Sequence, residues 1–70
     1  MARSDGTVAS FEDAHAVEET DKGLKVFFLG KARWLPKSGI DAASEVQEKE
    51  DRGRLIVKGW LARNEGWELD

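Results

Sequence analysis

Glycine divides this chain into short pieces, and that spacing limits what it can fold into. Six of the seven glycines follow residue 22, at the ends of short apolar runs: Gly23, Gly30, Gly39, Gly53, Gly59 and Gly66. Because glycine favours turns and weakens the interior of helices and strands, we expect no long element between them. The 70 residues hold only 19 large apolar side chains once alanine and Met1 are set aside, so we expect one small domain with a thin core.

Two segments have clear strand patterns. Residues 24–29 place Leu24, Val26 and Phe28 on one face, and residues 54–58 are rich in β-branched side chains. Further strands are expected over residues 11–20 and 32–35, the second of which stops at Pro36 because proline has no N–H for a sheet.

The C-terminal part of the chain has a different period. Residues 60–65 suit a short helix, with Gly66 as its C-terminal cap and Trp67 beyond it. Together with the strand patterns, this predicts a mainly β fold, a small antiparallel sheet or partly open barrel of about four or five strands with one short C-terminal helix.

Residues 38–48 allow two predictions. Ser38 followed by Asp41 resembles a helix capping box, and Ile40, Ala43 and Val46 would line one side of such a helix. The apolar stripe is weak, and Gly39 falls in the first turn, so we favour a loop followed by a short strand over residues 44–48.

The two ends of the chain differ in character. Residues 1–9 are small and polar, and we expect a disordered N-terminal lead followed by a single β domain over residues 10–70. The start of the chain lacks the apolar stretch of a signal peptide, and no apolar run nears the roughly 20 residues that span a bilayer, so we expect a soluble, cytoplasmic protein.

Catalytic and metal-binding patterns are missing. The chain has no cysteine and one histidine, His15, which is a poor basis for a zinc site. No serine lies in a nucleophile motif, and the glycines form no phosphate-binding loop. Paired acids are present, but a core this thin offers little burial to raise a carboxyl pKa. We therefore expect no enzyme activity, no cofactor and no metal.

Charge is arranged in blocks along the chain. Residues 10–21 carry five acids and no base, residues 22–37 carry five bases and no acid, and residues 38–53 sum to −3. Pairing between neighbouring strands would account for this order. The alternative is a basic hairpin that presents its charge to a phosphate or an acidic partner.

The basic segment also holds aromatic side chains, which gives it the one pattern with a binding mechanism. The candidate binding surface consists of Lys25, Phe27, Lys31, Arg33, Lys37 and Trp67. Rings stack on bases and cations hold phosphates in single-stranded nucleic acid binders, whereas exposed rings on a small sheet more often mark protein interfaces. Trp34 and Trp60 are expected to anchor the core.

Several segments resemble those of a group of small uncharacterised bacterial and phage proteins. They are Trp34-Leu35-Pro36-Lys37-Ser38, Ser44-Glu45-Val46 and Trp60-Leu61-Ala62. The resemblance covers residues 23–66 and implies a phage or mobile-element context, and it supports a strand over residues 44–48. Lys58-Gly59 departs from the group, which often has a proline and an acid before the last motif.

These observations predict a non-enzymatic interaction module that binds another protein through an exposed sheet face or edge. A phage or mobile-element accessory protein is the form that the resemblance implies. The alternative is an auxiliary single-stranded nucleic acid binding protein that uses the basic and aromatic hairpin over residues 22–37. We expect no membrane partner, and a monomer or weak dimer.

Overall fold

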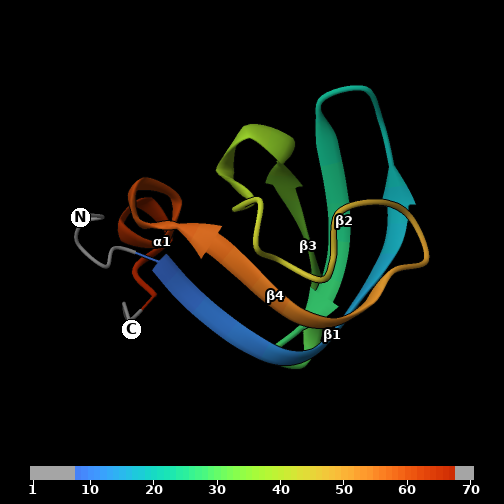
Figure 1. The fold of residues 1–70 in the computed structure, drawn as a ribbon, viewed down its shortest axis with the longest axis horizontal. Coiled ribbons are helices and arrows are strands. Elements are labelled where there is room, and N and C mark those ends of the chain that lie inside the picture. Colours follow the sequence, from blue (N-terminus) through green and yellow to red (C-terminus); the bar gives the residue numbers. More distant parts are fainter. Residues whose placement is uncertain (1–7, 68–70) are drawn as a thin grey trace.

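A four-stranded antiparallel sheet forms the body of the computed structural model, which describes residues 8–67 (Figure 1). The strands lie in the order β3-β2-β1-β4. Their bounds are β1 (Val8–Glu19), β2 (Gly23–Phe28), β3 (Lys31–Pro36) and β4 (Arg52–Lys58), with a 3-10 turn η1 (Lys37–Gly39) and a helix α1 (Gly59–Glu65). The predicted fold class, an antiparallel sheet with one short C-terminal helix, is confirmed.

β1 is one of the two inner strands and the longest of the four, and it bends. It pairs with both β2 and β4, and its register shifts twice, between Phe11 and Ala14 against β4 and between Ala16 and Glu18 against β2. Asp13, in the first shift, has a φ of 58°, which is left-handed backbone. An extra residue in one strand bends it and increases its twist, so β1 curves along its length (Figure 1).

The core lies on the inner face of this curved sheet, where alternate residues of every strand point. The buried side chains include Ala14, Ala16, Leu24, Val26, Phe28, Leu35, Leu55 and Val57 from the strands, and Val46, Leu61 and Ala62 from the loop and helix. Because Ala14 and Ala16 are small, the inner face of β1 leaves room for the larger side chains of β2 and β4.

Trp67 closes one end of the core through a helix cap. Gly66 has a φ of 80° and donates its N–H to the Arg63 carbonyl, while the Trp67 N–H reaches the Ala62 carbonyl at 2.8 Å. This is the Schellman arrangement. It directs the Trp67 ring toward Phe11 and Phe28, with ring centroids 5.3 Å away from each.

Residues 40–45 cover the outer edge of β4 without forming a regular strand. Ile40 makes a single bridge to Val57, and the Asp41 N–H donates to the Ile56 carbonyl at 2.8 Å. The Ser44 hydroxyl oxygen accepts N–H groups from Val46 at 3.1 Å and from Ile56 at 3.0 Å. A side-chain oxygen therefore accepts hydrogen bonds that the backbone carbonyls of a neighbouring strand would otherwise accept.

Two sequence predictions need correction here. The strand expected over residues 44–48 is wrong, and so is the alternative helix, because the segment is irregular except for η1. Val8 and Ala9, expected in the N-terminal lead, lie in β1 opposite Lys58 and Val57. Ala9 is buried, which accounts for its place in the strand. Residues 1–7 lie outside the described residues.

Ser44→Ala tests the role of this hydroxyl. The change leaves the Ile56 and Val46 N–H groups without their acceptor in a buried position, which should destabilise the fold by about 1–3 kcal/mol. Chemical denaturation of the variant measures the loss. Ser38→Ala, at an exposed position, is the control and should be neutral. Equal stability of the two variants would contradict the role assigned to Ser44.

Candidate interaction surface

The outer face of the β2–β3 hairpin is formed by the residues that alternate with the core positions. Lys25 lies opposite Trp34, and Phe27 lies opposite Ala32. Phe27 is 47% exposed and Trp34 is 53% exposed. Phe27 and Trp34 occupy diagonal positions across the two strands, and Cε3 of the Trp34 ring lies beside Gly23. We call Lys25, Phe27, Ala32 and Trp34 the hairpin face.

This face continues across the sheet. His15 of β1 lies opposite Phe27 on one side and opposite Arg52 of β4 on the other, which makes one row of outward residues. A shallow hollow of about 320 Å³ lies beside this row, lined by Asp13, Ala14, His15, Arg52 and Gly53. The hairpin face is therefore the aromatic end of a longer polar row.

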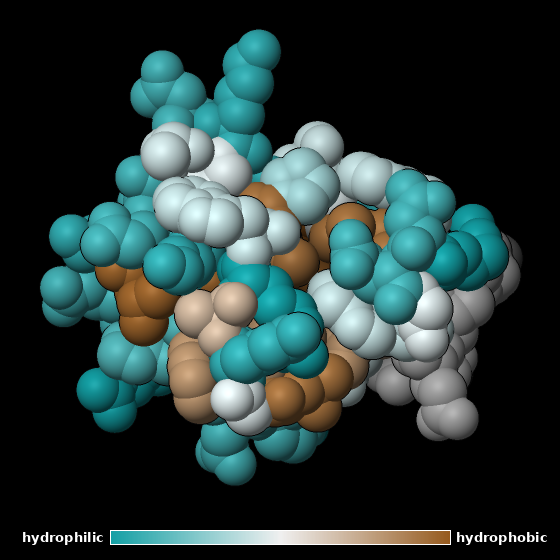
Figure 2. Space-filling model, turned by 180° about the vertical axis from the view of Figure 1, so that it is seen from behind, coloured by the Kyte–Doolittle hydropathy of each residue, from teal (hydrophilic) through white to brown (hydrophobic). Residues whose placement is uncertain are grey.

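Apolar side chains reach the surface elsewhere too. In Figure 2, which shows the molecule from behind, they form separate patches between hydrophilic side chains. Leu29 at the tip of the hairpin is 61% exposed, and Trp60 in α1 is 43% exposed. The hairpin face differs from these because two aromatic side chains share one regular sheet surface.

The predictions for Trp34 and Trp60 as core anchors are wrong. On β3, the inner face is occupied by Arg33 and Leu35, which lie opposite Val26 and Leu24, so Trp34 points outward. In α1 the buried side chains are Leu61 and Ala62, the neighbours of Trp60. Strand alternation counted from Leu35 places Trp34 outside, and this signal outweighs its apolar character.

The structure brings only part of the candidate binding surface together. Lys25 and Phe27 lie on the hairpin face, and Lys31 is exposed where β3 begins. Arg33 faces the inner side, where its guanidinium lies 4.8 Å from the centre of the Phe28 ring and donates to the Phe28 carbonyl. Trp67 is partly buried against the core and does not join Phe27.

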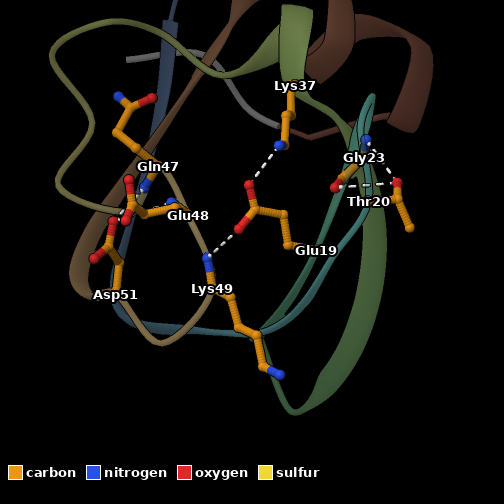
Figure 3. Close-up of polar contacts among 8 residues, drawn as sticks. All are labelled: Glu19, Thr20, Gly23, Lys37, Gln47, Glu48, Lys49 and Asp51. Atoms are coloured by element: carbon orange, nitrogen blue, oxygen red, sulfur yellow. Dashed lines mark hydrogen bonds and ion pairs between the residues drawn. The ribbon is translucent and has the colours of Figure 1, made fainter.

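Lys37 is held by Glu19 in a contact that joins three segments (Figure 3). One Glu19 carboxylate oxygen lies 2.5 Å from the Lys37 Nζ, and the other accepts the Lys49 N–H at 3.0 Å. These hydrogen bonds, the Lys37 contact first, hold the pKa of Glu19 below its ordinary value. Lys37 therefore helps to join β1, η1 and the loop after residue 46.

A second carboxylate orders the same loop. Asp51 Oδ2 accepts the N–H groups of Gln47 and Glu48, each at 3.0 Å (Figure 3). Directly after Glu19, the Gly23 N–H donates to the Thr20 hydroxyl at 3.0 Å and so closes the turn into β2. Glu19 and Asp51 thus hold this loop in place, while Lys25 and Lys31 of the hairpin form no ion pair within residues 8–67.

Within residues 8–67, no three His, Cys, Asp or Glu side chains are grouped so as to hold a metal ion. No helix of this part of the chain has the length and apolar character needed to cross a membrane. What the arrangement offers chemically is a pair of exposed rings beside lysines on a fixed sheet surface.

Comparison of the chain with protein-family models, with curated proteins and with solved structures finds no match. The resemblance to small bacterial and phage proteins therefore stays a prediction.

Trp34→Ala and Phe28→Ala should separate the two faces of the hairpin. Phe28 is 2% exposed, so its truncation should cost about 3–5 kcal/mol of unfolding free energy. Trp34 is 53% exposed, and its loss should cost about 1 kcal/mol or less. Thermal or chemical denaturation measures both, and a Trp34→Ala loss as large as that of Phe28→Ala would show that the ring is in the core.

Glu19→Gln should remove an acid-sensitive part of the stability. Because the pKa of Glu19 is lowered in the folded state, its contribution is present above the ordinary glutamate pKa of about 4.3 and is lost as the pH falls through the lowered value. The variant should therefore be less stable than the wild type at neutral pH, and the difference should shrink below about pH 4. Denaturation between neutral pH and about pH 3 measures it. Glu18→Gln is the control, and a Glu19→Gln difference that is constant with pH would contradict the assignment.

Proposed function

We propose that this chain is a non-enzymatic interaction module that binds another protein through the hairpin face and the adjoining sheet edge. The observation that carries the proposal is the placement of two aromatic side chains, Phe27 and Trp34, half-exposed on one surface. Exposed large aromatics are unfavourable in water, and they are enriched where proteins bind one another.

The support beneath these rings favours tight binding. The opposite side of the same strands is fully packed, with Leu24, Val26 and Phe28 of β2 and Leu35 of β3 all buried. The backbone that presents Phe27 and Trp34 is therefore fixed before a partner arrives, so little order must be gained on binding.

A second candidate is binding of single-stranded nucleic acid, and the exposure of Trp34 favours it. Trp34 lies directly opposite Lys25, which places a ring and a cation side by side. Bases stack on such rings with about 1–3 kcal/mol each. The other basic side chains of the hairpin are less suited to holding phosphates, because Arg33 lies on the inner side and Lys37 is paired with Glu19. We therefore rank a protein partner first.

A cytoplasmic accessory protein of a phage or mobile element, acting as a monomer or weak dimer, is the setting that we propose for this module. The sequence resemblance and the small size of the domain support that setting.

The double variant Phe27→Ala/Trp34→Ala tests the proposal. Immobilised wild-type protein should retain a partner from a lysate of the source cell, and the double variant should retain at least about tenfold less because it lacks both rings. Leu29→Ala and Trp60→Ala, which remove exposed apolar side chains elsewhere, are matched controls and should retain it fully. The partner is then purified and the affinities are measured directly.

Salt separates the two candidates. A protein interface built on aromatic rings should respond weakly to salt, whereas affinity for a single-stranded oligonucleotide should fall with a log–log slope of about −0.7 per phosphate contacted.

In the capture experiment, equal retention of one partner by the wild type, the double variant and the controls would contradict the role of the hairpin face.

A further inference from the structure

The two edge strands of the sheet differ in whether their outward backbone groups are hydrogen-bonded within the chain. At the β4 edge, the Glu45 N–H donates to the Arg54 carbonyl at 2.9 Å, and the Glu45 side chain accepts the Arg54 N–H at 2.8 Å. Ser44 and Asp41 engage the N–H and carbonyl of Ile56 in the same way. The β4 edge is therefore occupied by the chain itself.

The β3 edge is open. Leu29 and Gly30, with φ values of 52° and 83°, form a two-residue hairpin loop, so Phe28 and Lys31 are a hydrogen-bonded pair. Such pairs alternate along an antiparallel ladder, which makes Arg33 and Leu35 the next bonded residues of β3. The N–H and carbonyl groups of Ala32 and Trp34 therefore point away from β2, and they meet no partner among residues 8–67.

The charge around this edge selects what can pair with it. Lys31 and Arg33 lie on one side of β3, and neither forms an ion pair within the described part of the chain. A second copy is a poor occupant, because antiparallel pairing of two β3 strands through Ala32 and Trp34 would place Arg33 directly opposite Arg33. An acidic strand meets the same cations favourably.

We propose that β3 binds an extended acidic segment of a partner protein as an added antiparallel strand. The inference rests on the proposed function and names the chemistry of its partner. In the added strand, residues opposite Ala32 and Trp34 lie beside the rings of the hairpin face and are apolar. Residues opposite Lys31 and Arg33 lie on the other side and are acidic, so the segment alternates between the two kinds.

A peptide titration of the full chain tests strand addition. The probe is acetyl-Val-Glu-Val-Glu-Val-Glu-Val-amide, and the observables are amide shifts and hydrogen exchange of the ¹⁵N-labelled protein. Saturation should slow exchange of the Ala32 and Trp34 amides by at least about tenfold, because both become hydrogen-bonded. Replacing Glu by Lys in the peptide should weaken binding by at least about tenfold.

Ala32→Pro removes one outward N–H and leaves the pairing with β2 intact, since Ala32 does not bond to β2. Proline is tolerated on edge strands when its missing N–H faces solvent. This variant should lose peptide binding, and Ala32→Val, which keeps the N–H, should retain it. The exchange measurement on the wild type decides the matter if Ala32→Pro does not fold.

Three results would overturn the proposal. Peptide binding that shifts Phe27 and Trp34 side-chain signals but leaves amide exchange at Ala32 and Trp34 unchanged would reject strand addition and keep the hairpin face as a binding surface. A dimer that protects these amides without peptide would assign the edge to a second copy. No binding at millimolar peptide would reject an acidic strand, while capture with the Phe27→Ala/Trp34→Ala variant tests the proposed function separately.

Discussion

The bend in β1 is the constraint on which the rest of this structure depends. A flat sheet of four short strands would expose both faces, and a helix as short as α1 could cover only part of one. The register shift at Asp13 lets a single strand pair with β4 along one half and with β2 along the other. The sheet therefore curls around its own inner face, and a small set of large apolar side chains suffices to fill it.

The same curvature sets the roles of the remaining parts. Trp67, placed by the cap of α1, fills the inner side next to Phe11 and Phe28, where their rings are 4.8 Å apart. The loop after η1 reaches back across β4 and occupies its edge with the oxygens of Ser44 and Glu45. The hairpin face and the β3 edge are left without such cover, which is why the functional proposals concern them.

Local patterns in the sequence predicted the elements that depend on near neighbours. The alternation in β2, the β-branched run in β4 and the glycine cap of α1 each carry their own signal, and each was placed within one or two residues. The segment after Pro36 was harder, because Ser44 pairs with Ile56 through a side chain and not through strand backbone. Strand propensities describe how well single residues fit a sheet, so they do not report a hydrogen bond to the side chain of a distant residue.

The candidate surface shows a similar limit. The sequence predicts that Lys37 is part of the binding surface, but in the folded chain it donates a hydrogen bond to Glu19, which lies 18 positions earlier. Trp34 is expected in the core because it points away from Arg33, but Arg33 itself lies on the inner face with Leu35, so Trp34 points outward. For Lys37, a contact with a residue distant in sequence decides the outcome, and no local pattern reports it. For Trp34 the alternation is local, but which face of β3 is buried depends on the pairing of β3 with β2.

Hydrogen exchange of the free protein, resolved by residue, tests the central claim that one sheet edge is closed by the chain and the other is open. The Arg54 and Ile56 amides, held by Glu45 and Ser44, should be protected well above the Ala32 and Trp34 amides, which should exchange almost as fast as an unfolded chain. Protection of Ala32 and Trp34 equal to that of Ile56 in the monomer would contradict this account.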